Sequence, residues 1–236
     1  MTSTSGSRAA RALTSAAVTA SAQTTAGSRE IRIVILPPMR ILIPIGAAVL
    51  LLPVALAAYR EGPLPNMTGG FGDPNCRACH FDGALNAPGG RLALGGVPSA
   101  YVPGRTYPVT VTLRKNDLRR GGFEIVARFA SGSRKGKQAG AWIVAKDGRL
   151  QMVEGQQDPA LLFVQHTTAG SAAPAPGAIS WTLQWIAPVS TAPVQFNLAA
   201  NAANDDASPL GDFIYLTRTV SRPRAKTAPS DLIPSR

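Results

Sequence analysis

Short runs of alternating apolar and polar residues, separated by turns, dominate the chain from residue 90 onward. The 236 residues include 23 Gly and 20 Pro, a composition that favours many turns over long helices. Within the runs, β-branched and aromatic residues recur at every second position, as in strands with one buried face. The expected strands cover residues 91–94, 107–113, 123–129, 141–144, 150–153, 161–164, 181–186, 194–199 and 213–217.

Eight or nine short strands at this spacing predict an all-β domain, an immunoglobulin-like β-sandwich, over residues 91–220. The turn at Lys146-Asp147-Gly148 predicts that strands 141–144 and 150–153 pair as a hairpin. Trp181 and Trp185 stand four residues apart, on one face of a strand, and are expected in the core together with Trp142.

A different segment, residues 58–90, holds the reactive side chains. It contains Cys76-Arg77-Ala78-Cys79-His80, and these cysteines are the only two of the chain. Cys-x-x-Cys-His is the attachment sequence of a c-type haem, because two thiols add to the vinyl groups and the histidine reaches the iron. The sequence therefore predicts one covalent haem c on a loop or short helix, with Asn75 as its helix cap.

The second iron ligand is predicted to be His166, the only other histidine of the chain. It follows an apolar run and would join the N-terminal segment to the sandwich through the iron. Met152 and Met67 are the competing ligands, and either would raise the reduction potential relative to histidine.

Two other chemistries suit the same residues. A disulfide between Cys76 and Cys79 is compatible with an exported protein. Zinc is formally possible with Cys76, Cys79, His80 and His166 as its four ligands.

A polar stretch near the end of the sandwich gathers oxygen ligands: Asn201, Asn204, Asp205, Asp206 and Asp212. Calcium takes such ligands, but the spacing does not match an EF-hand loop. Asx turns in a strand connection are the favoured interpretation.

Charge and missing motifs restrict the function further. The formal net charge is +11, and residues 58–236 carry 19 Lys and Arg against 12 Asp and Glu, a net of +7. Basic runs at residues 114–120 and 134–137 lack interleaved aromatic residues, so we expect solvated hairpin tips and no nucleic-acid binding. An acidic redox partner would be attracted by this charge.

No catalytic triad, paired-carboxylate motif or phosphate-binding loop is evident, which predicts a protein that is not an enzyme.

The N-terminal region predicts export. Residues 1–38 are expected to be disordered or outside the mature protein, with Met39 rather than Met1 as the start. Residues 39–57 are typical of a signal peptide that ends at Ala55-Leu56-Ala57. The apolar run 41–58 is also marginally long enough to be an uncleaved membrane anchor. Both alternatives place the protein in the periplasm or outside the cell. Residues 221–236 are expected to form a disordered tail.

Several blocks along the chain carry a family resemblance. They are residues 68–72 with the motif 76–80, then 86–90, 96–98 and 101–104, then 122–123, 127–128 and 138–140, and finally 166–167, 181–185, 199–206 and 211–215. In this order the blocks resemble bacterial exported domains related to the Reelin N-terminal (reeler) domain, of the choice-of-anchor V type. The resemblance covers residues 63–220 and implies a β-sandwich with Cys-x-x-Cys-His at its N-terminal edge. Relatives of this fold serve as binding or accessory modules.

The function predicted is therefore an exported single-haem c protein that transfers electrons, with His80 and His166 as axial ligands. The alternative is a non-catalytic reeler-like binding module in which Cys76 and Cys79 form a disulfide. A third class, a haem sensor or enzyme, would require that the sixth position of the iron has no protein ligand.

Overall fold

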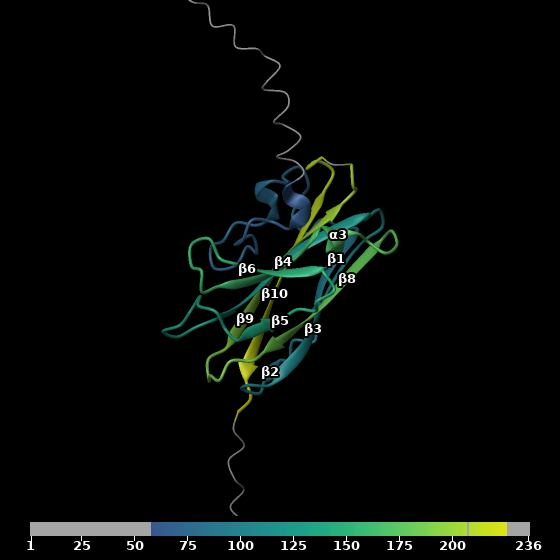
Figure 1. Cartoon of the computed structure of the whole chain (residues 1–236). Coiled ribbons are helices and arrows are strands. Elements are labelled where there is room, and N and C mark those ends of the chain that lie inside the picture. Colours follow the sequence, from purple (N-terminus) through teal and green to yellow (C-terminus); the bar gives the residue numbers. More distant parts are fainter. Residues whose placement is uncertain (1–57, 207, 226–236) are drawn as a thin grey trace, which may run out of the picture. The chain divides into compact units, whose positions relative to one another are not determined.

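In the part of the chain that the structure describes, ten strands form two sheets, which pack face to face (Figure 1). The computed structural model describes residues 58–206 and 208–225. The strands are β1 (Gly90–Gly95), β2 (Ala100–Tyr101), β3 (Thr106–Lys115), β4 (Arg120–Phe129), β5 (Ala141–Ile143), β6 (Leu150–Glu154), β7 (Leu162–His166), β8 (Ala178–Ile186), β9 (Val194–Ala203) and β10 (Phe213–Pro223).

The strand order confirms the predicted all-β sandwich. One sheet has four strands in the order β1-β3-β8-β5, and the other has six in the order β2-β10-β9-β4-β7-β6. Long antiparallel pairings hold each sheet together, with β4 and β10 flanking β9 along most of its length. Strand β10 continues to Pro223, so the sandwich extends slightly beyond the predicted boundary at residue 220.

The predicted hairpin between strands 141–144 and 150–153 is wrong. Strand β5 pairs with β8 in the four-stranded sheet, whereas β6 pairs with β7 in the six-stranded sheet. The turn around Asp147 therefore leads the chain from one sheet to the other. The sequence also gave no sign of the short strand β2, or of helix α3 (Thr168–Ser171), which is capped by the Thr167 hydroxyl.

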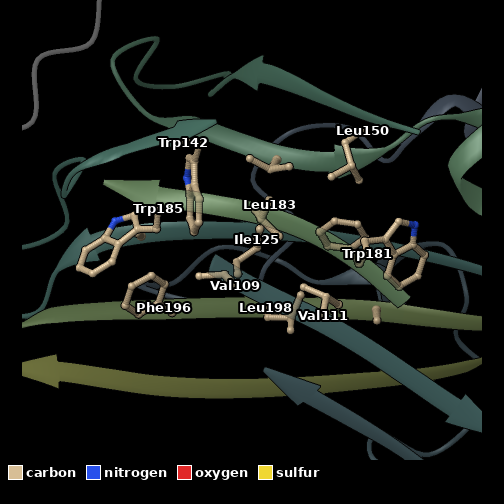
Figure 2. Close-up of a cluster of buried hydrophobic side chains, with 14 of the residues drawn as sticks. Val109, Val111, Ile125, Trp142, Leu150, Trp181, Leu183, Trp185, Phe196 and Leu198 are labelled. Atoms are coloured by element: carbon tan, nitrogen blue, oxygen red, sulfur yellow. The ribbon is translucent and has the colours of Figure 1, made fainter. Parts of the chain in front are cut away.

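The core lies between the sheets and confirms the tryptophan prediction (Figure 2). Trp181 and Trp185 are 1% and 0% exposed, and Trp142 is 5% exposed. The Trp185 ring lies 4.8 Å from that of Phe196, edge to face, and its indole N–H donates to the Ala139 carbonyl at 3.0 Å. Edge-to-face contacts of this kind add to the stabilisation from apolar burial.

The other face of the six-stranded sheet is covered by the N-terminal segment, residues 58–90. This segment holds two short 3-10 helices, η1 (Ala58–Glu61) and η2 (Cys76–Ala78). Hydrogen bonds join it to three strands: Met67 N–H to Glu124 on β4, the Gln165 amide on β7 to the Pro63 carbonyl, and Leu216 N–H on β10 to the Asn86 side chain. The segment is thus an added layer on the sandwich.

Glycine allows this layer to lie directly on the sheet. A Cβ atom added to Gly70 would stand 2.1 Å from Cγ of Asn197 on β9, which is far inside contact distance. Only a residue without a side chain leaves room for the Asn197 amide group at this position.

The predictions about residues 1–38, the signal peptide or anchor, and the tail beyond residue 225 lie outside the described residues. Within residues 58–206 and 208–225, no helix combines the length and the apolar character needed to cross a membrane.

Candidate cofactor site

The Cys-x-x-Cys-His motif forms a tight turn, and its predicted cap is confirmed. The Asn75 side chain accepts a hydrogen bond from Arg77 N–H at 2.9 Å, the interaction that starts η2. Cys79 N–H and His80 N–H both donate to the Cys76 carbonyl, at 3.2 and 3.0 Å. The turn therefore holds both thiols and the imidazole close together.

All four predicted site residues line one cavity of about 260 Å³. Cys76, Cys79 and His80 contribute from the N-terminal segment, and His166 contributes from the end of β7. The N-terminal end of β4, with Gly122, also lines the cavity. The structure thus brings together side chains that are far apart in the sequence.

His80 is oriented by a buried carboxylate. Its Nδ1 lies 2.8 Å from Oδ2 of Asp212, a residue only 2% exposed. Asn201 Nδ2 donates to the same oxygen at 2.9 Å and so fixes the carboxylate. A carboxylate accepts hydrogen bonds only, so Nδ1 carries the proton and the lone pair of the neutral ring is on Nε2.

His166 is held in a different way. It is 6% exposed, and its Nδ1 accepts a hydrogen bond from Phe123 N–H at 3.0 Å. Burial lowers the pKa of His166 to about 4, so the ring is neutral at physiological pH. A Cβ on Gly122 would stand 2.6 Å from its Cε1 and 2.9 Å from its Nε2. The glycine therefore makes room for the imidazole.

The two methionines that were predicted as competing iron ligands differ in their position relative to the cavity. Met67 lines the cavity. Met152 lies on β6, is 46% exposed, and does not belong to the cavity lining. Met67 is therefore the methionine that competes with His166.

Both cysteines are free thiols, so the predicted alternative of a Cys76–Cys79 disulfide is not what the structure contains. Burial, with a smaller contribution from the Glu124 carboxylate, raises the pKa of Cys76 to about 12. Within the described ranges, no three His, Cys, Asp or Glu side chains are arranged to hold a metal ion.

The polar loop between β9 and β10 confirms the Asx-turn interpretation. Asn204 accepts from Asp206 N–H at 3.1 Å, and Asp206 accepts from Ser208 N–H at 2.8 Å. Asp205 pairs with Arg120 at 2.5 Å and lies 3.6 Å from Arg60. These side-chain oxygens serve turns and ion pairs.

Sequence reasoning missed two parts of the site. Asp212 and Asn201 appeared as members of a polar loop, with no sign that they orient His80. Gly122 at the start of β4 was named only as part of the family resemblance, although glycine within a strand pattern marks close approach of another group. Oδ1 of Asn201 is buried on the cavity side of the sheet without a hydrogen-bond partner among the described residues.

Comparisons with known proteins give structural likeness only. The chain is similar to the Reelin-N domain of F-spondin, at 16% identity and a TM-score of 0.42, over 63% of this chain and 97% of that one. It is also similar to a human F-spondin reeler domain, at 19% identity and a TM-score of 0.39, over 62% and 98% of the two chains. A third similar structure is a Clostridium perfringens cohesin module from a family 33 glycoside hydrolase, at 9% identity and a TM-score of 0.37, over 58% and 96%.

No family model matches the chain, and no curated protein matches it. At TM-scores this low, the assignment to a β-sandwich depends on the strand order and the packed core described above.

Proposed function

We propose that the protein is an exported c-type haem protein that transfers electrons and catalyses no reaction. Cys76 and Cys79 hold the haem covalently, and His80 binds its iron. One observation carries the proposal: two free thiols at the required spacing share a cavity with both histidines of the chain.

The residues present fit this cofactor. Asp212 accepts from Nδ1 of His80, which leaves the Nε2 lone pair for iron and gives the carboxylate–histidine arrangement found behind many metal ligands. Covalent attachment consumes both thiols and needs them reduced, as they are here. When bound, haem supplies a one-electron couple between ferric and ferrous iron.

Electron transfer agrees with the exposure of the motif and with the charge of the chain. Cys79 lines the cavity and is exposed, so a haem attached there would be accessible to a partner. The net positive charge of residues 58–236 favours an acidic partner. The prediction that His166 fills the sixth position of the iron stays a prediction.

The alternative is a reeler-like binding or accessory module without haem. It uses the same sandwich and requires no cofactor, and its strongest support is the family resemblance of the sequence. The disulfide that it assumed is not formed.

Haem attachment is tested by expressing the full chain in a bacterium that carries the haem c attachment machinery. A haem stain after denaturing electrophoresis should detect the protein, and the stain should disappear in Cys76→Ser, Cys79→Ser double variants. Met152→Leu, on an exposed position of β6, is the control and should retain the stain. Colourless wild-type protein of the mass expected without haem would overturn the proposal. N-terminal sequencing of the exported protein would show whether residues 41–58 are removed.

The orientation of His80 gives a second test on the same protein. In Asp212→Asn, the ring loses its anionic acceptor and becomes less electron-donating, so the reduction potential should rise. Asp147→Asn, in the exposed turn before β6, should leave the potential unchanged.

A further inference from the structure

We propose, on the basis of the haem function above, that His166 is a hydrogen-bond donor to a small ligand on the open side of the iron. In this role it does not occupy the sixth coordination position. The iron of His80 would then bind an exogenous ligand in addition to exchanging electrons.

The Nδ1 atoms of the two histidines have opposite roles in their hydrogen bonds: Nδ1 of His80 donates, and Nδ1 of His166 accepts. Nδ1 of His80 faces a carboxylate, which can only accept, so its Nε2 presents a lone pair. Nδ1 of His166 faces Phe123 N–H, which can only donate, at 3.0 Å. In the neutral ring the proton of His166 is therefore on Nε2. A nitrogen that carries this proton donates a hydrogen bond and has no lone pair for iron.

Iron ligation by His166 would require the opposite tautomer. The proton would move to Nδ1 and would have to be donated to the Phe123 carbonyl, which lies at 3.3 Å. Phe123 N–H would then face another N–H group inside the protein and would lose its acceptor, an unfavourable arrangement for a buried backbone donor. The backbone of β4 thus selects the tautomer of the ring.

The residues around His166 restrict reorientation of its ring. His166 ends strand β7, pairs with Leu150 of β6, and is 6% exposed. Its Nε2–Cε1 edge lies above Gly122, at the distances given above for an added Cβ. A donor fixed in this way on the cavity wall suits a small ligand with a lone pair on its outer atom, such as water, azide or carbon monoxide.

Spectroscopy of the purified haem protein tests the proposal. We expect ferric wild-type protein to show an open or water-occupied sixth position and to bind azide. His166→Leu should weaken azide binding about tenfold, the effect of losing one hydrogen bond. His166→Gln keeps an acceptor for Phe123 and an N–H donor, and should stay within about threefold of wild type on the same estimate.

A vibrational measurement reports the hydrogen bond itself. In the ferrous carbon monoxide complex, the C–O stretching frequency should rise in His166→Leu and return towards the wild-type value in His166→Gln. Gly122→Ala should also raise it, because the added methyl displaces the ring while the histidine remains. Gly95→Ala, the same substitution on β1 of the four-stranded sheet, where an added Cβ would meet only the Thr110 carbonyl at 3.8 Å, is the control and should leave the frequency unchanged.

The outcomes separate the two proposals. Colourless protein overturns haem attachment and this inference with it. Haem protein with a bis-imidazole low-spin spectrum that is lost in both His166 variants keeps the haem and makes His166 a ligand, which overturns this inference alone. A low-spin spectrum that survives in those variants and is lost in Met67→Leu overturns it as well.

Discussion

The two faces of the six-stranded sheet are both buried, but by different chemistry. On the inner face, β4 and β9 present apolar side chains such as Ile125, Phe196 and Leu198 to the opposite sheet (Figure 2). On the outer face, the same strands present Glu124, Arg128 and Asn197, each at most 5% exposed, to the N-terminal segment. The inner face is stabilised by apolar area, and the outer face by individual polar pairs.

This difference has a functional consequence. Apolar packing tolerates exchange of one hydrophobic residue for another of similar volume, whereas a buried polar group needs its particular partner. The N-terminal segment is therefore positioned by the outer-face pairs, and with it the turn that holds Cys76, Cys79 and His80. The core defines the sandwich, and the polar face places the candidate site on it.

The largest effect is expected in the core. Phe196→Ala removes a fully buried ring in contact with Trp142 and Trp185, at centroid distances of 6.1 and 4.8 Å. We expect the free energy of unfolding to fall by about 3–5 kcal/mol. Chemical denaturation measures it, with Val189→Ala, at an 87% exposed position, as a control that should change by less than about 0.5 kcal/mol. Equal losses would show that the inter-sheet cluster does not dominate stability.

The next effect concerns the ion pair between Asp73 of the N-terminal segment and Arg128 of β4. Arg128 is 4% exposed and stacks at 5.4 Å from the rings of both Phe71 and Phe163. Asp73→Ala leaves this buried cation without its counter-ion, so we expect a loss of about 3 kcal/mol in the free energy of unfolding. Denaturant unfolding of the full chain is the measurement.

Two further variants test whether the loss in Asp73→Ala comes from the unpaired buried charge of Arg128. Asp73→Ala combined with Arg128→Met removes both charges and should recover most of the stability. Lys137→Ala breaks an exposed pair with Asp158, and should cost less than about 1 kcal/mol. If Asp73→Ala costs no more than Lys137→Ala, the outer-face pair does not hold the segment in place.

The inner face could be predicted from sequence, and the outer face could not. Alternation along residues 123–129 and 181–186 identifies strands and one apolar face, because a side chain at every second position points into the core. The same alternation gives no partner for Glu124 or Arg128. These partners, Met67 and Asp73, lie more than 50 residues earlier, and only the folded chain brings them together.

Part of the candidate site could likewise be predicted from the sequence, and part of it could not. The spacing of Cys76, Cys79 and His80 is local, so the motif and its Asn75 cap were predictable. The contact of His80 with Asp212 depends on where the β9–β10 loop lies against the segment. The sheet-crossing turn after β5 was mispredicted for a related reason, since a turn signal does not specify which strands it connects.

The outer face contains a carboxyl group, Glu124, whose protonation makes the free energy of unfolding depend on pH. Burial raises the pKa of this carboxyl to about 8, from 4.5. A group with a raised pKa binds more protons in the folded state, so stability falls as the pH rises from 4.5 to 8. His166 acts in the opposite direction below pH 6.5, because its pKa is lowered to about 4. Between pH 6.5 and 8.5 we therefore expect a loss of about 2 kcal/mol in the free energy of unfolding, from Glu124.

Glu124→Gln tests this assignment. The variant has no titrating group at this position, so its stability should change little between pH 6.5 and 8.5. Glu154→Gln, at an exposed position of β6, should retain the wild-type slope. A slope that persists in Glu124→Gln would mean that another group titrates in this range, and that the outer-face carboxyl is not protonated.

The smallest effect is expected at the cap of the haem-attachment turn. Asn75→Ala removes the acceptor of Arg77 N–H, at 2.9 Å, and should lower the free energy of unfolding by about 0.5–1 kcal/mol. Asn75→Asp keeps an acceptor and should be close to wild type. Hydrogen exchange at Arg77 and Cys79 should accelerate in the alanine variant alone, because the turn opens locally while both faces of the sheet remain packed. Global loss of stability comparable to that of Asp73→Ala would instead make the turn part of the buried polar layer.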